Sequence, residues 1–143
     1  MPRVLIIEDE PSLVKFLSQN LALRGWDVVV ATDGAEGLRQ ARDTHPDLIM
    51  LDLMLPVKSG WEVLETLRLE RDLRSTPVIV VTAAAREEDE RRARRLGATD
   101  YLLKPFGVPE MLRRIDAVLN SPPRVTRTAT ARKANRPLLG GTS

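Results

Sequence analysis

The sequence contains no cysteine, few aromatic residues and no long apolar run. Without cysteine there is no disulfide and no thiolate-bound metal, which fits a reducing compartment. The first apolar run reaches Glu8 after four residues, too short for the core of a signal peptide, and no later run approaches bilayer length. We therefore expect a cytoplasmic protein with no membrane partner.

The chain of 143 residues has room for one core and a tail. All 20 acidic residues lie before position 120, so the body is mildly acidic. The segment after that position has no acid, is rich in Pro, Thr, Ala and Gly, and shows no periodicity. Its basic residues are Arg124, Arg127, Arg132, Lys133 and Arg136. We predict a domain over residues 1–120 and a basic, disordered tail or linker over residues 121–143.

Short, continuous aliphatic runs suit strands that are buried on both faces of a parallel sheet. They occupy residues 4–7, 27–31, 48–51 and 78–82, with a shorter fifth run at 101–103. Stretches of helical period lie between and after them, at residues 12–24, 34–44, 60–73, 86–96 and 109–119. This alternation predicts an α/β fold, in which right-handed crossovers place helices on both sides of a parallel sheet.

The stretch 86–96 is almost wholly charged and offers only Ala93 and Leu96 for burial. One interpretation is a solvated helix with internal ion pairs such as Glu87–Arg91 and Glu88–Arg92. The other is a loosely held helix that moves when the protein changes state, because little apolar surface fixes it.

Polar side chains follow the predicted strands at the edge where parallel sheets collect ligands. They are Glu8, Asp9 and Glu10 after the first strand, Asp52 after the third, Thr82 at the end of the fourth and Lys104 after the fifth. Clustered carboxylates call for a cation, and oxygen ligands suit Mg²⁺. An ammonium group and a hydroxyl can both bind phosphoryl oxygens. Together these groups supply what transfer of a phosphoryl group to an aspartate requires.

The same positions argue against other α/β proteins. A dinucleotide-binding fold or a flavodoxin needs a phosphate-binding turn after the first strand, where the acids at 8–10 would repel phosphate. No Walker-type glycine loop occurs in the sequence. A phosphatase of the haloacid dehalogenase type would carry a second acid where Met54 stands.

The chain resembles the receiver domains of two-component response regulators, the CheY-like superfamily. The matching segments are residues 4–10, residues 51–56 with Gly60, residues 81–83 and residues 100–106. The resemblance covers residues 3–119. It implies a flavodoxin-like, five-stranded parallel sheet of order 2-1-3-4-5 with five helices on both faces.

By this resemblance, Asp52 is the residue that is phosphorylated. Asp9 and Asp52 would ligate Mg²⁺ directly, Glu8 would act through water, and the backbone carbonyl of Met54 would complete the protein ligands.

The resemblance also assigns Lys104 and Thr82 to hold the acyl phosphate, and Lys104–Pro105 is expected to be a cis peptide. Tyr101 matches the family's switch aromatic, which turns inward when Thr82 moves toward the phosphoryl group. We expect slow hydrolysis of the acyl phosphate, because Met54 and Ala84 cannot orient a water molecule.

The implied phosphodonor is a sensor histidine kinase or a phosphotransfer protein. The domain would not be an enzyme in the ordinary sense, since it catalyses only its own phosphorylation and dephosphorylation. In relatives, the face made by helix 86–96, strand 101–103 and helix 109–119 docks an output protein or a second copy. Asp100, Glu110 and Arg114 match charges that such homodimers use.

Two outputs stay open. The chain is either a single-domain regulator that signals by binding a protein, or the receiver part of a DNA-binding transcription regulator. The absence of a helix-turn-helix pattern after residue 119 favours the first. The tail has no aromatic residue to stack on bases, so its charges give only weak, salt-sensitive attraction to nucleic acid. A third reading, a scaffold that accepts no phosphoryl group, conflicts with the intact acidic site.

Overall fold

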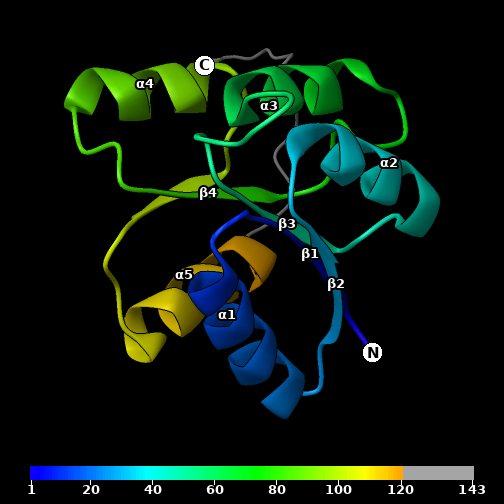
Figure 1. The fold of residues 1–143 in the computed structure, drawn as a ribbon, viewed down its shortest axis with the longest axis vertical. Coiled ribbons are helices and arrows are strands. Elements are labelled where there is room, and N and C mark those ends of the chain that lie inside the picture. Colours follow the sequence, from blue (N-terminus) through cyan, green and yellow to red (C-terminus); the bar gives the residue numbers. More distant parts are fainter. Residues whose placement is uncertain (121–143) are drawn as a thin grey trace, which may run out of the picture.

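The computed structural model describes residues 1–120 as five parallel strands that alternate with five helices (Figure 1). The elements are β1 (Arg3–Ile7), α1 (Pro11–Leu23), β2 (Asp27–Ala31), α2 (Gly34–Thr44), β3 (Leu48–Leu51), α3 (Gly60–Leu69), β4 (Val78–Thr82), α4 (Glu87–Arg95), β5 (Asp100–Leu103) and α5 (Val108–Asn120). The strand order is β2-β1-β3-β4-β5, and every neighbouring pair is parallel. The predicted fold is therefore confirmed.

The sheet is the middle of three layers. Figure 1 shows α1 and α5 on one face and α2, α3 and α4 on the other. Each face has its own apolar cluster, and consecutive residues of one strand alternate between them: Leu5 and Ile7 pack toward the α2–α3–α4 side, while Val4 and Ile6 pack toward α1 and α5. Because both faces are covered, continuous aliphatic runs are required in the central strands.

The predicted boundary of one helix was wrong. The apolar period of residues 60–73 predicts a helix to Leu73, but α3 ends at Leu69 because Glu70 is extended, with φ −89° and ψ 129°. Leu73 is buried, but it belongs to a separate turn, in which its amide donates to the carbonyl of Glu70. The prediction extended the helix by one turn because Leu73 is buried and lies at helical spacing from the apolar residues of α3.

The predicted tail at residues 121–143 lies outside the described residues, and its separation from the domain stays a prediction. Within the described part of the chain, no helix has the length and apolar character that crossing a membrane would need.

Candidate functional site

The carboxyl ends of the strands bring the predicted polar residues to one edge of the sheet. Backbone hydrogen bonds continue past the strands: the amide of Asp52 donates to the carbonyl of Ile7 at 3.0 Å, and the amide of Lys104 donates to the carbonyl of Thr82 at 2.9 Å. The ends of β1 and β3, and those of β4 and β5, are thereby held side by side. This edge is where ligands bind in open parallel sheets.

Glycine at position 60 lets the loop after β3 fold back on Asp52. A Cβ atom there would lie 2.1 Å from the Asp52 carbonyl oxygen, so no larger residue fits without moving the backbone. The next helix begins at once, with a capping box between Ser59 and Glu62. The start of α3 is thus held close against the backbone of Asp52.

Three carboxylates meet at this edge, as the sequence predicts. Each of Glu8, Asp9 and Asp52 offers an oxygen within 4.8 Å of the others. Glu8 and Asp52 are buried, whereas Asp9 is exposed. One oxygen of Glu8 accepts the Glu10 amide at 3.1 Å, and Oδ1 of Asp52 accepts the Met54 amide at 3.2 Å.

Lys104 supplies the cation nearest to these acids. Its Nζ lies 3.1 Å from Oε1 of Glu8 and 3.3 Å from Oδ2 of Asp52. Burial acts to lower the pKa of Lys104, but the two carboxylates outweigh it and raise that pKa, so the ammonium stays charged. Burial, with repulsion from Asp52, raises the pKa of Glu8 against the opposing contacts with the Glu10 amide and Lys104.

The cluster fits a hard divalent cation. The carboxylates of Glu8, Asp9 and Asp52 lie together, and the Lys104 ammonium, which contacts Glu8 and Asp52, cannot neutralise all three. Mg²⁺ takes oxygen ligands, usually one or two carboxylates together with several waters. Glu8, Asp9 and Asp52 are therefore the residues that could hold such an ion.

Thr82 and Tyr101 both form hydrogen bonds with the backbone of Ala84. The Ala84 amide donates to Oγ1 of Thr82 at 3.3 Å, and the Tyr101 hydroxyl donates to the Ala84 carbonyl at 2.8 Å. The ring of Tyr101 is buried and lies inward. Lys104–Pro105 is a cis peptide, as predicted. The sequence did not predict that Ala84 connects Thr82 with Tyr101, because only backbone atoms of Ala84 make these hydrogen bonds.

The sequence model of the response regulator receiver domain matches residues 4–116. The chain belongs to this family. Receiver domains interact with histidine kinases or phosphotransfer proteins.

Curated relatives include regulators of transcription. The chain is 43% identical over 129 residues to the DNA-binding dual master transcriptional regulator RpaA of Synechocystis, a match that covers 90% of this chain and 54% of that protein. It is 41% identical over 117 residues to the alkaline phosphatase synthesis regulator PhoP of Bacillus subtilis, covering 82% of this chain and 48% of PhoP. The chain thus spans about half the length of the curated relatives it matches.

Solved structures agree with the fold. The chemotaxis protein CheY4 of Vibrio cholerae superimposes with a TM-score of 0.79 at 31% identity, covering 83% of this chain and 99% of CheY4. The receiver domain of the sensor histidine kinase PA1611 of Pseudomonas aeruginosa has a TM-score of 0.78 at 30% identity, covering 84% and 98%. In that structure a magnesium ion is coordinated in the active-site cleft.

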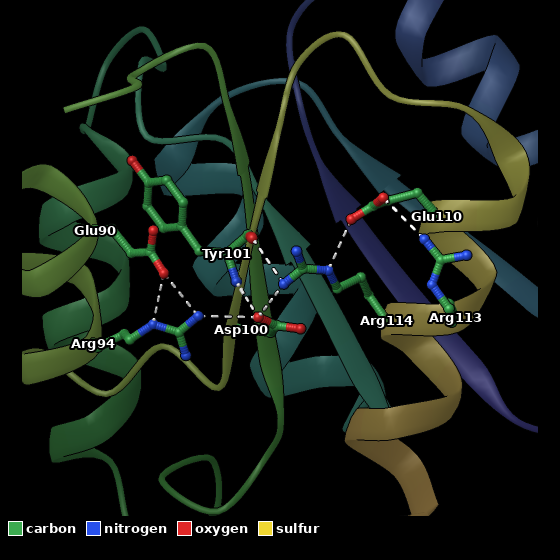
Figure 2. Close-up of polar contacts among 7 residues, drawn as sticks. All are labelled: Glu90, Arg94, Asp100, Tyr101, Glu110, Arg113 and Arg114. Atoms are coloured by element: carbon green, nitrogen blue, oxygen red, sulfur yellow. Dashed lines mark hydrogen bonds and ion pairs between the residues drawn. The ribbon is translucent and has the colours of Figure 1, made fainter. Parts of the chain in front are cut away.

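The charges that sequence matching connects with homodimers are paired within the protomer. Figure 2 shows Asp100 on β5 between Arg94 of α4 and Arg114 of α5, at 3.1 and 2.8 Å. Arg114 also contacts Glu110 at 3.1 Å, and Arg94 contacts Glu90 at 2.9 Å. These pairs join the two helices across β5. A homodimer that used the same charges would have to replace these ion pairs within the protomer with pairs between the two copies.

Proposed function

We propose that this receiver domain accepts a phosphoryl group on Asp52 from a phosphohistidine donor. The observation that carries the proposal is the environment of Asp52: a buried carboxylate beside two further acids, with the ammonium of Lys104 at 3.3 Å. A carboxylate so placed can act as a nucleophile toward phosphorus once the neighbouring charges are neutralised.

In this reaction an oxygen of Asp52 forms the bond to phosphorus while the bond from phosphorus to the donor nitrogen breaks. The electron pair leaves with the imidazole of the donor. Lys104 and the hydroxyl of Thr82 are the groups proposed to bind the transferred phosphoryl oxygens. Hydrolysis later returns Asp52 to the carboxylate, so the domain catalyses reactions of its own side chain only.

We further propose that Asp9, Asp52 and the carbonyl of Met54 hold Mg²⁺, with Glu8 acting through water. When bound, this ion would neutralise the charge that gathers on the phosphoryl oxygens. The proposal is supported by the three clustered carboxylates, which one ammonium cannot neutralise, and by the magnesium ion in the related receiver of PA1611. We also propose that the domain lies in the cytoplasm, where it would meet its phosphohistidine donor.

The decisive experiment measures intact mass after incubation with acetyl phosphate, with and without Mg²⁺. We expect one added phosphoryl group on the wild type only when Mg²⁺ is present, and none on Asp52→Asn. Asp72→Asn, at an exposed turn, is the matched control and should behave as the wild type. If the wild type gains no mass under any condition, phosphotransfer is ruled out and a scaffold function replaces it.

A second candidate concerns the output. The match covers only about half of each of the transcription regulators among the relatives, which supports a receiver that serves a DNA-binding regulator. The alternative is a single-domain regulator whose α4–β5–α5 face binds an output protein or a second copy. Salt-dependent DNA binding that is lost on deletion of residues 121–143 would favour contact between the tail and DNA. Phosphorylation-dependent dimers would favour the second copy.

A further inference from the structure

The two ends of α4 are held very differently. At the N-terminal end, Arg86 is the N-cap residue but makes no side-chain cap hydrogen bond. Its guanidinium contacts Glu88 and Asp89 at 3.3 and 3.6 Å, with Arg86 and Glu88 largely exposed. Surface pairs of this kind contribute at most about 1 kcal/mol. The N-terminal turn is therefore weakly attached to the rest of the domain.

The C-terminal end is bound by the partly buried side chain of Arg68 from α3. Its Nε and Nη2 both donate to the carbonyl of Gly97, at 3.0 and 2.8 Å. Its Nη1 donates to carbonyls of the turn between α3 and β4, with the shortest bond, 2.7 Å, to Thr76. Burial lowers the pKa of Arg68 to about 10, so the guanidinium is still charged at neutral pH. One cation thus ties the end of α4 to α3 and to the start of β4.

Gly97 is required for this contact. Its φ of +109° is a conformation that other residues rarely adopt, and a Cβ atom would lie 2.6 Å from Cγ and Nε of Arg68. Glycine therefore allows both the turn out of α4 and the close approach of the guanidinium.

The other firm contacts of α4 also lie in its C-terminal half. Ala93 is fully buried. The guanidinium of Arg92 lies 4.1 Å from the ring centroid of Trp61 on α3, and so stacks on an aromatic ring. The predicted Glu88–Arg92 pair is not among the ion pairs of the described residues, whereas Glu87 and Arg91 do pair, at 3.6 Å.

The N-terminal end, by contrast, continues directly into the candidate site. Residues 83–86 connect α4 to Thr82, and the backbone of Ala84 is hydrogen-bonded to both Thr82 and Tyr101. A change at Thr82 therefore reaches α4 at its weakly held end, while its other end stays bound.

We propose that Arg68 is a positioning residue that fixes the C-terminal end of α4, so that phosphorylation makes α4 pivot at Gly97 instead of shifting as a whole. The proposal rests on the proposed function for the phosphorylation step, but the attachment of α4 by Arg68 does not depend on it. The pivot directs the motion to the N-terminal turn of α4, at the acidic residues 87–90.

Hydrogen exchange of the full chain, read by mass spectrometry with and without acetyl phosphate and Mg²⁺, tests this. In the wild type, phosphorylation should change exchange in residues 83–91 and leave residues 95–99 unchanged. In Arg68→Met the change should extend through residues 95–99. Arg42→Met is the matched control: it removes an arginine that bonds Glu70 between α2 and α3, away from α4, and should keep the wild-type pattern.

Two further variants keep the test decisive if Arg68→Met does not fold. Arg68→Lys retains the charge with fewer hydrogen bonds and should give an intermediate pattern. Gly97→Ala displaces the guanidinium from the opposite side and should act like Arg68→Met. If residues 95–99 respond equally in the wild type and in these variants, the pivot is refuted.

Exchange without any phosphodonor separates the two proposals. Loss of Arg68 should raise exchange of residues 95–99 by roughly tenfold in the unphosphorylated protein, since bonds to a charged donor are lost. If the wild type cannot be phosphorylated but this increase is found, the proposed function fails and the attachment by Arg68 stands. If Arg68→Met and Arg42→Met show the same exchange there, the attachment itself is wrong.

Discussion

The Nζ atom of Lys104 lies 3.3 Å from Oδ2 of Asp52 and 3.1 Å from Oε1 of Glu8, so one ammonium pairs with two buried carboxylates. With Asp9 close by, three negative charges face a single positive one. The unbalanced charge favours binding of a divalent cation, and such a cation would compete with Lys104 for the same oxygens.

The first prediction concerns this competition. Lys104→Met should bind Mg²⁺ about tenfold more tightly, which corresponds to about 1.4 kcal/mol, because a positive charge beside the ion is removed. The same variant should take up less phosphoryl group from acetyl phosphate, because a ligand of the phosphoryl oxygens is lost. Titration calorimetry gives the first quantity and intact mass the second. Lys15→Met, exposed on α1, serves as control. Unchanged Mg²⁺ affinity would mean that Lys104 does not compete.

The second prediction concerns pH. Burial and the Asp52 charge raise the pKa of Glu8, so its ionised form destabilises the folded protein. The stability it contributes is full below its ordinary pKa range and is lost as pH rises through the raised pKa. Without Mg²⁺, Glu8→Gln should therefore unfold at higher urea concentration than the wild type at pH 7.5, and this advantage should shrink at pH 4.5.

Exposed Glu65→Gln, on α3, is the comparison for that measurement. Adding Mg²⁺ at pH 7.5 should stabilise the wild type more than Glu8→Gln, because only the ionised side chain favours a cation. An advantage of Glu8→Gln that is the same at both pH values would exclude titration of Glu8 as its cause.

The fold follows from patterns that the sequence carries locally. The aliphatic runs at 48–51 and 78–82 are too short for helices and too apolar for loops, and each is followed by a polar residue at the sheet edge. The position of Asp52, and its closeness to Glu8, follow from strand order alone once the sheet is parallel. For this reason the acidic cluster could be predicted before any geometry was known.

Contacts made by long side chains with distant backbone could not be predicted. In the sequence, Arg68 cannot be told apart from an exposed helical arginine. Its acceptors at Thr76 and Gly97 are backbone carbonyls, which every residue possesses. Arg92 has an acid four residues earlier, yet stacks on Trp61 instead. Tertiary packing overrides local pairing in such cases, and one sequence alone holds no sign of it.

The third prediction concerns the lifetime of the acyl phosphate. The side chain of Met54 is exposed next to Asp52, while its amide donates to Asp52, so a substitution can change the side chain and keep that bond. In Met54→Asn the acyl phosphate should hydrolyse at least about tenfold faster than in the wild type, because an amide side chain can orient a water molecule. Met54→Leu should retain the slow rate. Loss of phosphoryl group is followed by intact mass after the donor is removed. Equal rates in all three proteins would exclude water orientation at this position as the limit.

The fourth prediction concerns Val57, in the loop between Asp52 and α3. Its φ is +69°, and the amide of Lys58 donates to the carbonyl of Pro56 at 2.7 Å, so Val57 is the central residue of a γ-turn with positive φ. For a β-branched residue this conformation costs about 1–3 kcal/mol. Glycine adopts it without strain, although its greater freedom in the unfolded chain costs about 0.4–1 kcal/mol. The valine side chain is 83% exposed, so its removal loses little burial.

Val57→Gly should therefore stabilise the domain by about 1 kcal/mol, the difference between these two effects. Val57→Ala keeps a Cβ atom but loses the branch, and should lie between valine and glycine. Urea unfolding of the three proteins at one pH measures the order. The opposite order, with glycine least stable, would mean that the unfolded-state entropy exceeds the strain and that the turn imposes little cost on valine.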